Sequence, residues 1–139
     1  MNLEEKAIEE FKSKMDGSEQ LQETILTFYE CEVGFSGMVG IANGPTPIKG
    51  ILGYSNKQLL FYGEMFKKVP ISFQIPSDQI AKIKEKKQPF TLFKSVPSFV
   101  VFHQNDQVTF TTRGDQEEFA KLKLFFDHML SMFDVVSSS

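Results

Sequence analysis

Cysteine, histidine and tryptophan are scarce in this sequence: its 139 residues hold one cysteine, two histidines and no tryptophan. The lone Cys31 allows neither a disulfide within the chain nor a thiolate metal cluster, so we expect a reducing, cytoplasmic setting. The histidines, His103 and His128, lack the spacing of metal ligands. We therefore predict no metal and no other cofactor.

A catalytic set of residues is missing as well. Cys31 lies among apolar neighbours in a predicted strand, where a free cysteine behaves as a small hydrophobic side chain. The acidic residues gather near the starts of predicted helices, where helix formation and capping account for them. Because no nucleophile is matched with a base, we predict that the chain is not an enzyme.

Long apolar runs and an excess of positive charge are absent too. No stretch reaches the roughly 18 apolar residues of a transmembrane helix, and the charged N-terminus holds no signal-peptide core. The net charge is −3, and the 15 phenylalanines stand at core-like spacings with little arginine nearby. This composition argues against a nucleic-acid partner. We expect a cytoplasmic protein that is at most peripheral to a membrane.

Two stretches have the apolar spacing of an amphipathic helix. The first covers residues 3–15 and ends at Asp16-Gly17-Ser18, a composition typical of helix ends and turns. The second follows Asp115 and Glu118, which resemble a capping box. Its apolar stripe consists of Phe119, Leu122, Phe126, Met129, Leu130 and Phe133. Further apolar residues widen that stripe beyond what one contact surface needs: Leu124, Phe125 and Met132.

Strand-like patterns fill most of the remaining chain. Residues 24–33 favour a strand, and residues 50–63 predict a hairpin in which two apolar runs, 51–54 and 59–62, flank a polar turn. In residues 69–76, apolar residues alternate with proline or polar ones. The two prolines of that stretch predict a strand that lies at an edge or begins and ends beside a bulge, because proline donates no backbone hydrogen bond.

Three further strands are predicted toward the C-terminus. Residues 79–87 place Lys82, Lys84 and Lys86 on one side and Ala81 and Ile83 on the other. Residues 90–96 suit a short strand or an arm. Strands 99–103 and 108–112 flank a turn at Asn105-Asp106, with Val108 and Phe110 facing inward and Thr109 and Thr111 facing outward.

The order of these elements predicts a mainly β, α+β fold, because strands and helices do not alternate as in a parallel sheet. We expect a bent antiparallel barrel of about seven strands, capped by the C-terminal amphipathic helix, with an extra N-terminal helix. The chain divides into a helical extension (1–16), one domain (24–133) and a disordered tail (134–139).

The stretch Gly50–Tyr62, GILGYSNKQLLFY, resembles the G-x-L-x-x-T-N-x-R-L-x-F hairpin of the pleckstrin-homology-like (PH-like) superfamily, particularly its bacterial PH-like and GRAM-type domains. Ser55 stands where Thr is usual, and Gln58 stands where Arg is usual. The segment 75–83 and the closing Phe119-x-x-Leu122 are similar to the family's next strand and final helix. The resemblance covers residues 24–133 and implies a PH-like barrel.

The resemblance also implies a binding module. In related domains the groove between the C-terminal helix and a sheet edge accepts peptides by strand addition, and bacterial members form ring-like homo-oligomers through sheet edges. The leading hypothesis is therefore a non-catalytic module that self-associates or binds a protein or peptide. The candidate contact residues are Leu3, Ile8, Phe11, Leu124, Phe125 and Met132. Packing within the chain is the alternative for these residues.

Weak binding to an anionic membrane is the alternative function. Phosphoinositide-binding PH domains carry several basic residues around the first strand pair, where this chain offers only Lys49. A lysine face beside the apolar, glycine-rich segment 34–44 would instead contact the membrane. Its candidate residues are Lys49, Lys67, Lys68, Lys82, Lys84, Lys86, Lys87, Phe35 and Met38. The same lysines are also suited to keep a phenylalanine-rich sheet soluble.

Overall fold

The computed structural model describes residues 2–31, 46–66, 68–89, 95–112, 116–133 and 137–138. A short 3-10 helix, η2 (Ser77–Gln79), joins the fourth strand to the fifth. The other elements follow in the order α1 (Leu3–Lys14), β1 (Leu21–Cys31), β2 (Thr46–Ser55), β3 (Gln58–Met65), β4 (Val69–Pro76), β5 (Ile80–Pro89), β6 (Ser95–His103), β7 (Asp106–Thr111), α2 (Gln116–Phe133) and β8 (Ser137–Ser138).

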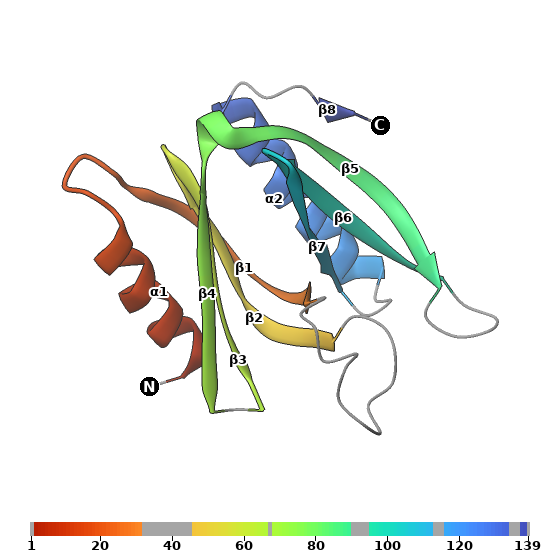
Figure 1. Cartoon of the computed structure of the whole chain (residues 1–139), viewed down its shortest axis with the longest axis horizontal. Helices are drawn as coiled ribbons and strands as arrows, with labels where there is room; N and C mark the ends of the chain where they lie inside the picture. Colours follow the sequence, from red (N-terminus) through yellow and green to blue (C-terminus); the bar gives the residue numbers. More distant parts are fainter. Residues whose placement is uncertain are drawn as a thin grey trace.

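The strands form one sheet in the order β4-β3-β2-β1-β7-β6-β5-β8. Strands β1 to β7 pair antiparallel with their neighbours, and β8 pairs in parallel with β5. Figure 1 shows the sheet bent into two halves, β1–β4 and β5–β7. The mainly β, α+β fold with two helices is confirmed. The sheet is open rather than a closed barrel, since β4 and β5 share no ladder in the described ranges.

The β2–β3 hairpin lies between two layers of side chains. Leu52 and Phe61 belong to the main core, whereas Ile51 and Tyr62 belong to a second cluster beneath α1. A strand that is buried on both faces has a continuous apolar run rather than an alternating one. This double burial explains the unbroken apolar sequence on both arms of the hairpin.

Helix α1 packs on the outer face of β2 and β3 in the same molecule (Figure 1). Asn2 caps the helix, because its Oδ1 accepts a hydrogen bond from the Glu5 backbone N–H at 2.8 Å. Ala7 and Phe11 are fully buried, and a Cβ added at Gly53 would lie 2.9 Å from the Phe11 ring. The prediction that Phe11 contacts a partner is therefore wrong, because this stripe packs within the chain.

Helix α2 lies in the bend of the sheet and contacts both halves. The Phe125 ring lies 5.1 Å from the Tyr54 ring of β2, centroid to centroid, and the Phe126 ring lies 5.0 Å from Phe99 of β6. A helix that packs against two sheet halves needs a wider apolar face than one stripe provides. Phe125 is 1% exposed, so the prediction that it is a contact residue is wrong.

A bulge shifts the register at the start of β5. The pairing with β6 slips between Ile80 and Lys82, so that Ile80 and Ile83 are both buried while Ala81 is exposed. The predicted inward position of Ala81 is wrong, because a bulge inserts one extra residue into a strand of period two. The three lysines beyond the bulge keep the exposed side predicted for them.

The turn between β6 and β7 lies one residue earlier than predicted. His103 pairs with Asp106, and Gln104 adopts the left-handed backbone region with a φ of 53°. Phe110 lies in the core, and Thr109 and Thr111 lie on the opposite face, as predicted, although both threonines are buried. Strand β7 lies in the middle of the sheet between β1 and β6, where neighbouring strands cover small side chains on either face.

The ends of several elements also differ from the prediction. Strand β1 begins at Leu21 rather than near residue 24, and β6 begins at Ser95, within the predicted arm. Two residues of the predicted disordered tail, Ser137 and Ser138, pair with β5. The predicted capping box at Asp115 lies outside the described residues.

Candidate interaction surface

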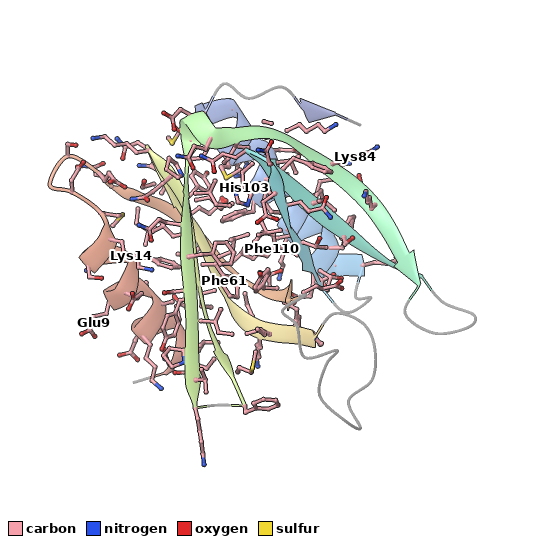
Figure 2. The ribbon with its side chains drawn as sticks, viewed as in Figure 1. Glu9, Lys14, Phe61, Lys84, His103 and Phe110 are labelled. Carbon is pink, nitrogen blue, oxygen red and sulfur yellow. The ribbon has the colours of Figure 1, made fainter. Side chains whose placement is uncertain are left out.

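Strand β5 is the last strand of the antiparallel run β4-β3-β2-β1-β7-β6-β5, and it carries a row of lysines. Lys82, Lys84 and Lys86 are exposed and alternate along the strand, so they share one face of the sheet. Within the described ranges, none of the three forms an ion pair with a carboxylate. Figure 2 shows Lys84 on the outer side of β5, away from the core residues Phe61 and Phe110. The row is therefore a strip of uncompensated positive charge.

The neighbouring strand β6 holds two of these lysines together. Lys82 pairs with Phe102 across the ladder. The Nζ atoms of Lys82 and Lys86 lie 5.0 and 5.8 Å from the centroid of the Phe102 ring. The face of an aromatic ring attracts ammonium groups at such distances. Phe102 thus keeps both charges over the face of the sheet rather than dispersed in solvent.

A short segment of the chain itself lies along β5. Ser137 pairs with Ile83, and Ser138 pairs with Lys84, in a parallel ladder. Because β5 runs from Ile80 to Pro89, most of this edge has no strand beside it in the part of the chain that is described. The outer edge of β5 is therefore only partly filled.

The opposite edge of the sheet is less suited to pairing. Strand β4 carries Pro70 and Pro76, which donate no backbone hydrogen bond. Phe66, at the turn before it, is 76% exposed, and Val69 is 52% exposed. Prolines on an edge strand hinder the addition of another strand. The prolines therefore make β4 the less suited of the two edges to an added strand.

The other predicted membrane-contacting residues do not join the lysine row. Lys49 is exposed on β2, and three strands of the sheet lie between β2 and β5. Lys68 is exposed at the turn between β3 and β4. The remaining members of the predicted surface lie outside the described residues: Phe35, Met38, Lys67 and the side chain of Lys87.

The predicted protein-contact residues divide by exposure. Leu124 and Met132 on α2 are 56% and 45% exposed. Leu3 and Ile8 on α1 are half-buried, whereas the two phenylalanines of the set are buried, as described above. The helices therefore offer less free apolar surface than the sequence predicts.

An apolar groove that no sequence pattern indicates lies beside the start of α1. Its volume is about 470 Å³, and it is lined by Asn2, Leu3, Glu4, Leu26, Lys49, Ile51 and Glu64. Leu26 pairs with Ile51 across the β1–β2 ladder and remains 41% exposed, because α1 packs chiefly on β2 and β3. Predicting this groove requires the register of β1 against β2, which sequence periodicity does not provide.

The polar residues of the β2–β3 turn hold the connection between α1 and β1. Ser55 Oγ donates to Glu19 Oε2 at 2.7 Å, and Gln58 Nε2 donates to the same oxygen at 2.8 Å. Lys57 Nζ lies 3.0 Å from Asp16 Oδ2. Ser55 and Gln58 therefore both serve the fold here.

These contacts favour the ionised form of the two acids. Hydrogen bonds from Ser18 and Lys57 lower the pKa of Asp16 to about 2. Burial opposes the ionisation of Glu19, but hydrogen bonds from Ser55 and Gln58 outweigh it, so the pKa of Glu19 lies below its ordinary value. Both carboxylates are therefore charged at neutral pH and anchor the turn.

The two histidines lie on different elements, His103 on β6 and His128 on α2. The buried Nε2 of His103 has no hydrogen-bond partner among the described residues, and the Nδ1 of His128 lies 2.9 Å from Glu23 Oε1. No group of three or more His, Cys, Asp or Glu residues in the described segments is placed to hold a metal ion. Neither helix, over its described length, is long and apolar enough to cross a membrane.

Comparison with known proteins shows a similarity of fold. No model of a known protein family matches the sequence, and no curated protein sequence matches it either. The C-terminal domain of an unknown protein from Leishmania infantum has a similar structure, with a TM-score of 0.57 and 17% identity over 95% of this chain and 98% of that one. The hSac2 domain of the human phosphoinositide phosphatase Sac2 is also similar, with a TM-score of 0.59 and 10% identity over 100% and 92% of the two chains.

Proposed function

We propose that this chain is a non-catalytic, PH-like interaction module that binds an extended protein segment at the edge of β5. The observation that carries this proposal is the pairing of β8 with Ile83 and Lys84, in which β5 already receives an added strand. Strand addition provides affinity through main-chain hydrogen bonds and specificity through alternate side chains. The strand order and the C-terminal helix support the PH-like assignment.

The lysine row favours a different protein over a second copy of this chain. If two β5 edges paired antiparallel about a two-fold axis, the lysines of one copy would face those of the other. Like charges directly opposite each other destabilise a strand pair. Pairing through β4 is opposed by its two prolines. Self-association through either edge is therefore disfavoured.

Binding to an anionic membrane is the second candidate, and the lysine row favours it. Each lysine near such a surface contributes about 1 kcal/mol, and one structural neighbour is a domain of a phosphoinositide phosphatase. The apolar residues of this hypothesis, Phe35 and Met38, lie outside the described segments. A membrane uses only the charge of β5, whereas an added strand uses both its charge and its open edge, so we prefer the protein partner.

Peptide selection followed by hydrogen exchange tests the proposed binding mode. Peptides selected for the full chain from a random linear library should slow amide exchange in β5 and leave β4 unchanged. The slowing follows because an added strand hydrogen-bonds the free backbone groups of the edge. Protection centred on α2, near Leu124 and Met132, would contradict the proposal.

Removing the internal competitor gives a second test. A chain ending at Phe133 lacks β8, so it should bind a selected peptide more tightly, by about twofold if β8 occupies the edge half of the time. The double variant Ser137→Pro/Ser138→Pro keeps the length of the chain and should behave in the same way, because proline lacks the backbone donor. Unchanged affinity in both, measured by fluorescence anisotropy, would show that β8 and the peptide use different surfaces.

A further inference from the structure

The geometry points to a partner segment that is acidic at every second position. We propose that its carboxylates face Lys82, Lys84 and Lys86 when the segment lies along β5. This inference rests on the proposed strand addition at β5 and adds the chemistry of the partner. Its basis is the charge and the register of the β5 edge.

The register of β8 shows where the side chains of an added strand lie. Ser138 pairs with Lys84, and residues paired across a ladder share one face of the sheet. Partner residues two positions to either side would then pair with Lys82 and Lys86. The intervening positions would share the face of Ile83, which is buried in the core. The recognised pattern is therefore acidic–x–acidic–x–acidic.

The charges of this surface are complementary to such a pattern. Neighbouring strands lie about 4.8 Å apart, so each carboxylate would come within ion-pair reach of a lysine side chain. Within the described ranges, the three lysines have no carboxylate partner, and Phe102 already holds two of their ammonium groups over the sheet. Three exposed cross-strand pairs, each worth a few-fold in affinity, together give about a tenfold effect.

Three designed peptides test the inference on the full chain. The first carries Glu at alternate positions, the second has the same composition with its Glu residues in one block, and the third replaces each Glu of the first with Gln. We expect the alternating peptide to bind about tenfold more tightly than the other two at physiological salt. Fluorescence anisotropy measures the affinity, and hydrogen exchange maps the amides that the peptide protects.

Matched variants locate the charge effect. Lys82→Gln/Lys84→Gln/Lys86→Gln should lose about the same tenfold for the alternating peptide. Lys12→Gln/Lys121→Gln/Lys123→Gln removes three exposed lysines from the helices instead, so its net charge is the same, and it should retain the affinity. Circular dichroism and urea denaturation of both variants establish that each is folded.

Each other outcome overturns a defined part of the proposal. Equal affinity for the alternating and block peptides would refute the register argument. Equal affinity for the Gln peptide, with β5 still protected, would refute the acidic partner and leave strand addition standing. If no peptide protected β5, both proposals would fail. Binding only to mixed phosphatidylserine and phosphatidylcholine vesicles, lost in the β5 variant, would identify the row as a membrane surface and refute the peptide.

Discussion

Glu19 is the residue on which the polar turn network depends. Its Oε2 accepts hydrogen bonds from Ser55 and Gln58, and both donors are buried. We expect Glu19→Ala to lower the free energy of unfolding by about 1–3 kcal/mol, because Ser55 Oγ loses its acceptor and Gln58 Nε2 keeps only the Lys14 carbonyl oxygen, at 3.3 Å. Urea denaturation at neutral pH measures the loss. Glu9→Ala, at an exposed site on α1, is the control and should stay within about 0.5 kcal/mol; equal losses would contradict the network.

The neighbouring Asp16 gives the protein an acid-sensitive contact. A carboxyl group whose folded pKa is lowered stabilises the fold above its unfolded pKa, and this stability is lost as pH falls through the folded pKa. For Asp16 the pKa falls from 3.8 to about 2, so the loss occurs between these two pH values. Asp16→Asn should therefore show a shallower decline of the urea midpoint over that range. An unchanged acid profile would mean that the hydrogen bonds from Ser18 and Lys57 are absent in solution.

Adjacent residues of α2 provide a direct test of how the element packs. Phe125 is 1% exposed and Leu124 is 56% exposed. We expect Phe125→Ala to cost about 3–5 kcal/mol of unfolding free energy, because it leaves a cavity between α2 and the sheet. Leu124→Ala should change stability by less than about 0.5 kcal/mol. Similar losses for the two variants in urea denaturation would contradict the orientation of the helix.

At the level of elements, local periodicity predicts the helices and most strands but not how they meet. The stripe of α2 gives its core-facing side, yet Phe125 is assigned wrongly because the width of that side depends on the bend of the sheet. Ala81 is assigned wrongly because a bulge at the start of β5 interrupts the period of two. Both errors arise from contacts between distant segments, which a local pattern does not contain.

The candidate surface on β5 is likewise predicted only in part by the sequence. The alternation of Lys82, Lys84 and Lys86 along a strand is visible in the sequence, and their exposure agrees with it. The position of β5 beside an open edge depends on the order of strands across the whole sheet. The proline-bearing strand β4 lies at an edge, which is one of the two positions that its prolines predict, because a missing backbone donor is a property of the residue itself.

For the whole molecule, the two ends of the antiparallel run carry different features that oppose self-pairing. Strand β4 uses prolines, and β5 uses a row of like charges beside its short partner β8. Both are recognised ways to prevent edge-to-edge association. The lysine row would therefore exclude a second copy while admitting a segment of opposite charge, which links solubility to partner choice.

This dual role predicts what happens when the charges are removed without loss of strand propensity. Lys82→Thr/Lys84→Thr/Lys86→Thr should raise the scattering mass with concentration, because threonine favours strands and no longer repels a second β5 edge. The unaltered chain should keep the mass of one chain over the same concentration series. The control variant is Lys12→Thr/Lys121→Thr/Lys123→Thr, which removes equal charge from the helices. It should also keep the mass of one chain. Dimerisation of the unaltered chain through β5, detected by slowed amide exchange in that strand at high concentration, would contradict the repulsion and favour self-association as the role of this edge.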